Sequence, residues 1–298
     1  MIINAQNIAG LRTGFSMAFN QGFEGAEVNY PEIATVVPSA TSEQHYSWLG
    51  QIPNMKEWIG DREIQNLSQY DYSIKNKNFE MTVSVNRSEI EDDQYGVYTP
   101  LMRFMGESAA RHPEQLVFEA LKNGFTEKCY DGKAFFAKDQ ASGKDGGTAA
   151  SNLGDKKLSS ESYSEARKNM MMLTGDQGKS LGIVPNLLIV SPALEEEGRK
   201  ILEAEFVDGS SNILRGTAKL MVSTELSYKE SYWFLVDNRK FLKPFIYQER
   251  KKIVFVNKDK ETDDNVFMRN EYIYGAEGRS NAGYGFWQMA FGSTGPKA

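Results

Sequence analysis

One stretch of the sequence decides the fold: Thr99-Pro-Leu-Met-Arg-Phe-Met-Gly-Glu-Ser-Ala-Ala-Arg-His-Pro-Glu-Gln-Leu-Val-Phe-Glu-Ala-Leu-Lys-Asn-Gly124. Its apolar residues recur at near-helical spacing, which predicts a helix over residues 99–123. Thr99 suits the N-cap with Pro100 at the first helical position, and Gly124 suits the position just past the end. Because Pro113 lies inside the run, we expect a kink or a break just before it.

The chain after this helix alternates between loops, helices and strands. Residues 125–158 are polar and rich in glycine, which predicts a loop. The later patterns predict helices over residues 160–174 and 191–206, and strands over residues 185–190, 218–223, 232–236, 252–257, 266–274 and 284–291. These elements place the chain in the α+β class.

The chain before the helix has two unusual segments. Residues 1–45 are interrupted by glycine and proline, which predicts an extended arm with one short helix over residues 7–20. Residues 46–91 predict a long β-hairpin that projects from the body. Within it, residues 79–85 alternate apolar and polar side chains, and an upstream partner region supplies the apolar residues Trp48, Trp58, Ile59 and Ile64.

The composition excludes several classes of protein. One Cys and two His are too few for an intrachain disulfide, a cysteine-rich zinc site or a multi-histidine metal centre. No apolar run approaches the roughly 20 residues of a membrane span, and the first residues do not resemble a secretory signal. We therefore expect a soluble protein of a reducing compartment that uses no membrane, metal or cofactor.

The charge distribution argues against a free-standing nucleic-acid binder. The chain has 40 acidic and 34 basic side chains, a net charge of −6. Residues 1–150 carry a net charge of −7 and residues 151–298 a net charge of +1. Proteins that bind nucleic acid on their own are usually basic, since phosphate contacts supply much of the affinity. The unequal halves are compatible with subunits that attract one another.

One motif resembles the nucleophile elbow of α/β-hydrolases. Gly178-Lys-Ser-Leu-Gly182 matches the pattern G-x-S-x-G, which would make Ser180 the nucleophile of a serine hydrolase. That motif needs a strand before it, a helix after it and a later His. Here a helix is predicted before it and a strand after it, and both His45 and His112 come earlier in the chain. A plain loop is the better interpretation.

Other candidate sites have equally simple explanations. The residues Asp259 to Asp264 lack the glycine and the last glutamate of a calcium loop, so a solvated acidic turn is favoured. Cys129 and His112 could form a thiol–imidazole pair, but a half-buried Cys and a capping His are simpler. Arg250-Lys-Lys252 reads as a charged strand edge that discourages unwanted pairing. We predict no catalytic, cofactor or metal site, and no enzyme.

Eight stretches share their order and spacing with one known family. They are Ile33-Ala-Thr-Val-Val-Pro-Ser39, Tyr46-Ser-Trp-Leu-Gly-Gln-Ile-Pro53, Glu57-Trp-Ile-Gly-Asp-Arg62, Arg87-Ser-Glu-Ile-Glu-Asp-Asp-Gln-Tyr-Gly96, Cys129-Tyr-Asp-Gly-Lys-Ala-Phe-Phe136, Pro185-Asn-Leu-Leu-Ile-Val-Ser-Pro-Ala-Leu194, Leu242-Lys-Pro-Phe-Ile246 and Gly278-Arg-Ser-Asn-Ala-Gly-Tyr-Gly-Phe-Trp287. With these stretches the chain resembles the major head subunit of Mu-like phages and prophages.

The resemblance implies the Hong Kong 97-like capsid fold. On that fold, residues 1–45 would be the N-terminal arm and residues 46–91 the extended hairpin loop. Residues 92–175 would form the peripheral domain, with the helix at 99–123 as its spine. Residues 176–258 would form the axial domain, and residues 259–298 strands that return to the core.

The same resemblance implies a structural role in the virion. The chain would be a major capsid protein that self-assembles into hexamers and pentamers of an icosahedral head. Its partners would be copies of itself, a scaffolding protein and a portal during assembly in the host cytoplasm, and packaged double-stranded DNA bound without sequence specificity. The alternatives are the shell protein of an encapsulin-type compartment and, far less favoured, the hydrolase built on Ser180.

Six residues are the candidates for contacts between subunits. A ribbon and an arm without a core of their own must bury their apolar side chains against another surface, and large apolar and Arg side chains are enriched at such contacts. The candidates are Trp48, Trp58, Ile59 and Arg62 of the hairpin loop, and Phe15 and Phe19 of the arm.

Overall fold

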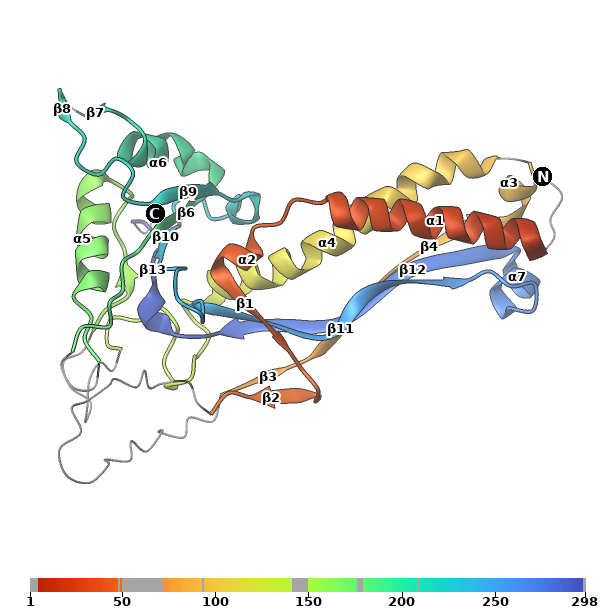
Figure 1. Ribbon diagram of the computed structural model, residues 1–298, viewed down its shortest axis with the longest axis horizontal. Helices are drawn as coiled ribbons and strands as arrows, with labels where there is room; N and C mark the ends of the chain where they lie inside the picture. Colours follow the sequence, from red (N-terminus) through yellow and green to blue (C-terminus); the bar gives the residue numbers. More distant parts are fainter. Residues whose placement is uncertain are drawn as a thin grey trace.

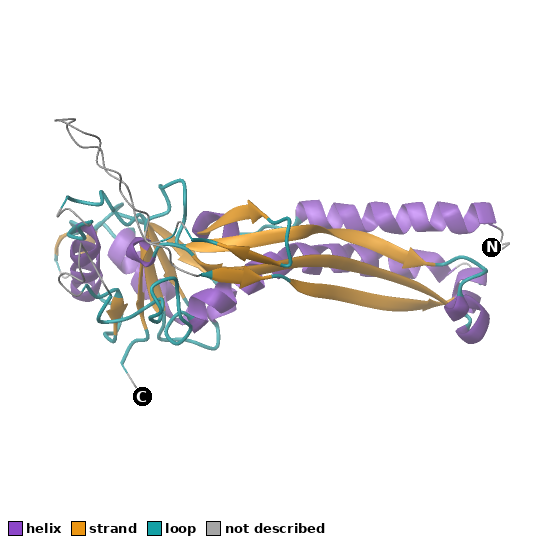
Figure 2. Cartoon of the chain, turned by 90° about the horizontal axis from the view of Figure 1, so that it is seen from below, coloured by secondary structure: helices purple, strands orange, loops and turns teal. Residues whose placement is uncertain are grey.

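The computed structural model describes residues 5–47, 49, 72–92, 94–140, 150–175, 179–207 and 209–296. Figure 1 shows a long part, in which the helices α1 (Ala5–Gly25) and α4 (Tyr98–Asn123) lie above a sheet, and a shorter part built on a second sheet. Figure 2 shows from below how the strands of the first sheet run along the long part.

The long part is built on a four-stranded sheet in the order β1-β11-β12-β4. Its strands are β1 (Ala34–Pro38), β4 (Lys77–Asn86), β11 (Phe245–Lys258) and β12 (Glu271–Tyr284). β11 and β12 form an antiparallel pair joined through the helix α7 (Asp264–Arg269), β4 pairs antiparallel with β12, and β1 runs parallel to β11. Helices α1 and α4 cover only one face of this sheet. For this reason the apolar side chains of residues 79–85 in β4 are partly or fully buried, and the polar side chains between them are exposed.

Helix α1 is part of the core of this long part. Its side chains Ile8, Leu11, Phe15 and Phe19 form a buried stripe at helical spacing. Two glycines bring α1 and α4 together backbone to backbone. A Cβ atom on Gly22 would lie 2.0 Å from the carbonyl oxygen of Arg103, and one on Gly106 would lie 2.0 Å from that of Phe19. The helix predicted over residues 7–20 is part of α1. One of the glycines that suggested an extended chain, Gly22, instead permits close packing of α1 on α4.

The shorter part is built on a five-stranded sheet in the order β5-β13-β10-β6-β9. The strands are β5 (Leu153–Gly154), β6 (Leu187–Val190), β9 (Lys219–Val222), β10 (Trp233–Val236) and β13 (Ala290–Ser293), and the helices are α5 (Ser160–Met171) and α6 (Glu195–Leu202). Every residue of β6 and β10 is buried. Their side chains alternate between two cores, one shared with α5 and α6 and one shared with the end of α4 and the start of β11. The second core joins the two parts.

Short elements complete the fold. They are α2 (Tyr30–Ile33), β2 (Glu43–His45), β3 (Ser73–Lys75), α3 (Arg87–Glu91), β7 (Phe206–Val207), β8 (Ser210–Ser211) and the 3₁₀ turns η1 (Gln94–Val97), η3 (Pro192–Leu194), η4 (Thr224–Leu226) and η5 (Trp287–Met289). β2 pairs with β3, so the two arms of the chain that enter and leave residues 46–72 lie side by side.

Several sequence predictions are confirmed. The helix predicted over residues 99–123 is α4. The break expected just before Pro113 does not occur, because α4 continues through this residue. Pro113 is itself buried, and the apolar contacts of its neighbours hold this turn in place. The N-cap is Val97 rather than Thr99, and it makes no side-chain cap. The helices predicted over residues 160–174 and 191–206 are shorter than expected, ending at Met171 and Leu202.

Other predictions were wrong. Residues 266–269 of the strand predicted over 266–274 belong to α7. Most of the strand predicted over 284–291 is the turn η5 and its flanks. β4 pairs with β12. The upstream partner region predicted for it, with Trp48, Trp58, Ile59 and Ile64, lies outside the described residues. The two sheets draw on segments far apart in the chain: α5 packs beside β13 of the five-stranded sheet, and β11 belongs to the long sheet.

Candidate assembly surfaces

The geometry around Ser180 does not match a nucleophile elbow. The Ser180 hydroxyl is exposed, and its Oγ accepts a hydrogen bond from the Gly182 N–H at 3.1 Å. Helix α5 comes before it and strand β6 after it, the reverse of the order that the elbow requires. Ser180 therefore lies in a surface loop.

Cys129 and His112 do not form a thiol–imidazole pair. The Cys129 thiol is buried and donates to a carboxylate oxygen of Asp131 at 3.1 Å. Burial and the nearby Asp131 carboxylate raise the pKa of this thiol, so it stays protonated. The His112 ring instead packs edge-on against Phe79, with 4.2 Å between the ring centroids. Neither side chain is arranged for nucleophilic catalysis.

The part of the chain that the structure describes also offers no metal site or membrane helix. Among these residues, no group of His, Cys, Asp and Glu side chains could hold a metal ion. None of their helices is long and apolar enough to span a bilayer.

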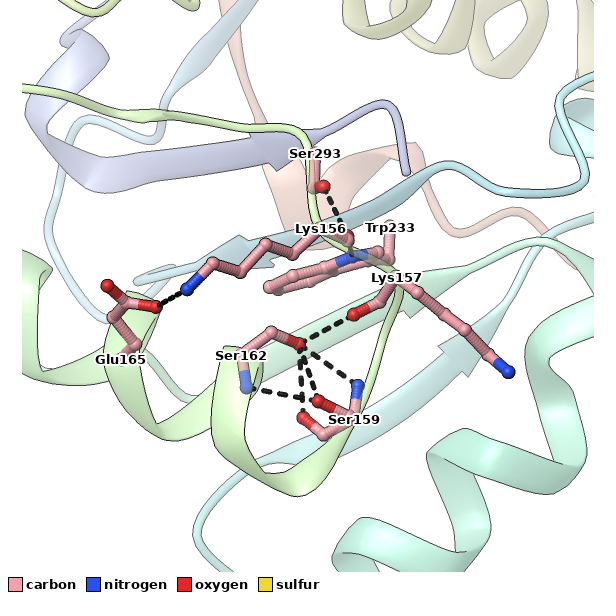
Figure 3. Close-up of polar contacts among 7 residues, drawn as sticks. All are labelled: Lys156, Lys157, Ser159, Ser162, Glu165, Trp233 and Ser293. Carbon is pink, nitrogen blue, oxygen red and sulfur yellow. Dashed lines mark hydrogen bonds and ion pairs between the residues drawn. The ribbon is translucent and has the colours of Figure 1, made fainter. Parts of the chain in front are cut away.

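A polar cluster at the start of α5 is fully used for packing (Figure 3). The backbone carbonyl of Lys156 accepts hydrogen bonds from the Trp233 indole N–H at 3.0 Å and the Ser293 hydroxyl at 2.8 Å. The Lys156 ammonium pairs with Glu165 at 2.6 Å, and Ser159 and Ser162 form a capping box. These bonds attach the start of α5 to β10 and β13, beside a cavity of about 220 Å³.

The acidic turn contains one buried carboxylate, which corrects the prediction of a solvated turn. Asp259 is completely buried. It accepts hydrogen bonds from Arg12 of α1 at 3.3 Å, from Asn257 at 2.6 Å and from the Tyr274 hydroxyl at 3.4 Å. Asp259 thus ties α1 to the far end of the β11–β12 pair.

The basic triplet begins where β11 becomes an edge strand. β1 pairs with β11 only as far as Glu249, and the register of β11 against β12 shifts on either side of Lys251. Arg250, Lys251 and Lys252 are exposed, and Lys251 pairs with Glu277. Charges and bulges of this kind discourage strand addition, which agrees with the charged-edge interpretation.

A buried polar network anchors the base of the loop over residues 46–72. Gln248 of β11 accepts a hydrogen bond from the Tyr46 hydroxyl at 2.8 Å and donates to the carbonyl of Ile74 at 3.1 Å and to the Asn76 side chain at 2.8 Å. On the other arm, the Tyr72 hydroxyl accepts from the Tyr284 N–H at 2.7 Å. Burial raises the pKa of Tyr46 to about 12, which keeps this donor protonated. Both arms of the loop are therefore fixed to the sheet.

Large apolar side chains are exposed near both ends of the molecule. On α7, which Figure 1 places at the far end of the long part, Phe267 is 85% exposed and Met268 75% exposed. On the shorter part, Phe206 of the β7–β8 hairpin is 63% exposed, and Ile213, two residues after β8, is 89% exposed. Exposed apolar side chains that gather at the extremities of a molecule are typical of protein–protein contacts.

A third apolar surface lies along the first turns of α4. Val97, Leu101 and Phe104 are exposed at i, i+4 and i+7 spacing, which places them on one face of the helix. The stripe that faces the α1–sheet core, including Met102 and Met105, is separate and buried. Helix α4 is therefore apolar on two sides at this end.

The structure places the predicted contact residues as follows. Trp48, Trp58, Ile59 and Arg62 lie outside the described residues. Phe15 and Phe19 are 1% and 2% exposed and belong to the core of their own chain, so in this conformation they are not available to a neighbour. Sequence analysis missed Phe267 and Met268, because the segment was assigned to a strand in which alternate residues would be buried.

Comparison with known proteins decides the family. The model of the Mu-like prophage major head subunit gpT matches residues 8–157, 151–226 and 222–296. The chain belongs to this family. It is a major capsid protein, a structural subunit of a phage head, as its sequence predicted.

Individual relatives agree with this assignment. The chain is 34% identical to the major capsid protein of Escherichia phage Mu over 290 residues, which cover 97% of this chain and 74% of that protein. It is also 34% identical over 283 residues to the Mu-like prophage FluMu major head subunit of Haemophilus influenzae, covering 95% of this chain and 71% of that one.

Solved structures confirm the Hong Kong 97-like fold. A chain of the procapsid of bacteriophage JBD30 superimposes with a TM-score of 0.64 at 34% identity, covering 98% of this chain and 76% of that chain. The head subunit thus has the mixed helix and sheet architecture that the resemblance implied.

Proposed function

We propose that this head subunit assembles with copies of itself into hexamers and pentamers, and that these close an icosahedral shell around double-stranded DNA. The observation that carries the proposal is the exposure of large apolar side chains at both ends of an elongated subunit, on α7 and on the β7–β8 hairpin. A shell needs many modest contacts repeated by symmetry, and head-to-tail contacts close when each repeats around a rotation axis.

The partners and the location follow from this role. Assembly takes place in the host cytoplasm with a scaffolding protein and a portal, and the mature shell is part of the virion. DNA is enclosed without sequence specificity, in keeping with a net charge of −6, which disfavours tight binding of phosphate. The subunit acts without a catalytic site.

The proposal is tested by purifying the particles that the chain forms and imaging them by electron microscopy. We expect closed shells with five-fold and six-fold clusters of subunits and, from infected or induced cells, nuclease-protected duplex DNA. Particles that carry a cargo protein in place of DNA would favour the encapsulin-type compartment. A chain that forms no ring, tube or shell with or without its scaffold would contradict the proposal.

The hairpin loop supplies a second test of the same proposal. Trp58→Ala should leave a folded subunit, because described helices and strands form the buried clusters of both sheets. The variant should fail to form closed shells. Shells of normal yield from Trp58→Ala would exclude this residue as an interface anchor.

A further inference from the structure

Strand β4 is an edge of the long sheet among the residues that the structure describes. Its ten residues pair with β12 in one unbroken register, and Glu80 is the single charged side chain over residues 78–86. The free edge of β11 differs, because the basic run Arg250–Lys252 and two register shifts interrupt it. Runs of charge and bulges protect a free edge, whereas a long regular edge accepts a further strand. β4 is therefore the edge of this sheet that is suited to pairing.

The side of β4 that faces the helices is incompletely covered. Phe79, Met81 and Val83 point to this side and remain half-buried, because α4 packs mainly over β11 and β12. A strand added beside β4 would continue this face and cover the three side chains. Removing apolar surface from water in this way favours the added strand.

The exposed apolar stripe on the first turns of α4 lies on the same side as β4. After Phe104 the stripe continues at helical spacing into Ser108 and His112. These two residues line a groove of about 420 Å³, whose other walls include Phe79 and Met81 of β4. The stripe, the groove and the β4 edge therefore form one continuous surface.

We infer that two copies of the chain pair through β4, antiparallel, about a two-fold axis that passes through Met81 perpendicular to the sheet. The two four-stranded sheets then form one continuous sheet, with the helices of both copies on the same face. The inference rests on the proposed self-assembly and names one of its contacts. Such a contact is isologous, since the same surface serves both copies.

The residues that meet in this register suit one another. Apolar side chains are opposed on the helix side and polar side chains on the other side, as cross-strand pairing requires. The opposed pairs are Phe79 with Val83, Met81 with Met81, Asn78 with Ser84, and Glu80 with Thr82. No two like charges are directly opposed, so the strand is complementary to itself.

The same axis brings Phe104 of each copy to the groove of the other. Helix α4 begins beside the end of β4, because only α3 and η1 lie between them in the chain. His112 is level with Phe79, whose ring it contacts with 4.2 Å between centroids. Phe104 precedes it by eight residues, about 12 Å of helix or roughly 3.5 residues of strand, which is the level of Val83. An axis at Met81 exchanges the levels of Val83 and Phe79.

The groove has the shape and lining to accept this side chain. Ala109, Ala276 and Gly278 contribute little or no side chain to its lining, which leaves room for a ring. Phe104 is 64% exposed in the single chain. Each pair of copies buries two such rings beside aromatic neighbours, and buried aromatic side chains contribute strongly to protein contacts.

A cysteine cross-link in assembled particles tests the inference. The double variant Asn78→Cys with Ser84→Cys places thiols at exposed positions that are opposed between copies. Within one chain these positions are about 20 Å apart, so no internal link forms. Mild oxidation should give a covalent dimer on a non-reducing gel and nothing larger, because each copy has one β4. The matched control is Lys252→Cys with Lys258→Cys, which has the same spacing at exposed positions on β11.

The outcomes separate this inference from the proposed function. A dimer from the β4 cysteines and none from the β11 cysteines supports the pairing. Particles without the dimer, a ladder beyond the dimer, or equal dimer from both variants would each overturn it, while the proposed shell would stand. A dimer from a chain that never forms rings or shells would instead overturn the proposed function.

The contact of Phe104 with the groove has its own test. In the variant with the β4 cysteines, Phe104→Ser should lower the rate of dimer cross-linking by about tenfold, because both buried rings are lost. Met17→Ser is the matched control, since Met17 is 58% exposed on α1 and lies outside the stripe. Equal rates for the two variants would overturn the placement of Phe104 in the groove.

Discussion

The two sheets of the subunit are buried in different ways, and the difference separates folding from assembly. Strands β6 and β10 of the five-stranded sheet are covered on both faces, and every one of their residues is buried. Strand β4 of the long sheet is covered by helices on one face only, so its polar residues remain exposed. The central strands of the shorter part are thus buried on both faces, as in a globular core. The long part is an extended layer covered on one face, and its far end carries Phe267 and Met268.

The largest expected effect distinguishes the two kinds of strand. Phe234→Ala in β10 should lower the free energy of unfolding by about 4 kcal/mol, because the side chain is fully buried in the core that joins the two parts. Val83→Ala in β4 should cost only about 1 kcal/mol, since Val83 is half-buried. Urea unfolding of both variants measures the difference, and equal losses would show that the two sheets are covered alike.

The helix pair on the long sheet should be nearly as sensitive. Gly106→Ala should lower the free energy of unfolding by about 3 kcal/mol, because the added Cβ atom would lie 2.0 Å from the backbone oxygen of Phe19. Gly10→Ala on α1 is the matched control. Nothing lies within 4 Å of its added Cβ atom, so this change should stabilise the helix by about 0.5–1 kcal/mol. Thermal melting of both proteins checks the pair, and a harmless Gly106→Ala would mean that α1 is not docked as described.

The polar clamp at the far end should have an intermediate effect. Asp259→Ala leaves Arg12, Asn257 and Tyr274 without their common acceptor. This loss should lower the free energy of unfolding by about 2 kcal/mol. Hydrogen exchange should then increase in α1 and at the β11–β12 end, and not in β6 or β10. Uniform loosening of the whole chain would contradict the separation of the two parts.

A smaller effect should appear on acidification. Burial places the pKa of His112 below its ordinary value of 6.5, so the folded chain binds this proton less readily than the unfolded chain. The resulting stability is present above pH 6.5 and is lost as the pH falls below it. Between pH 7.5 and pH 5.5 the melting temperature of His112→Phe should therefore fall less than that of the unaltered protein. An equal fall in both proteins would show that His112 does not contribute to the pH dependence of stability.

Local patterns predicted much of this fold, and distant pairings account for most of what was missed. The runs at residues 187–190 and 233–236, the alternation over 79–85 and the helix over 99–123 each carry their own periodicity, so each could be predicted. The pairing of β4 with β12 could not, because the partners are nearly 200 residues apart. Helix α1 was underestimated because Gly22 suggests a loop until the backbone of Arg103 is placed beside it.

The contact residues were harder to predict than the fold. Phe15 and Phe19 were expected at a subunit contact because an arm has no core of its own. They lie instead on α1, and the packing of this helix buries both side chains in the core of their own chain. Phe267 and Met268 carry no signal in the sequence that separates them from buried residues. Their exposure follows only from the short helix α7, which turns them away from the sheet.

The most direct test of this division is sedimentation velocity of the double variant Phe267→Ser with Met268→Ser beside the unaltered chain. Both side chains are exposed, so the free energy of unfolding of the variant should be unchanged to within about 0.5 kcal/mol. The account predicts fast-sedimenting shells or rings from the unaltered chain and mostly single subunits from the variant. An equal fast-sedimenting fraction from both proteins would contradict the claim that the exposed end of the long part carries assembly.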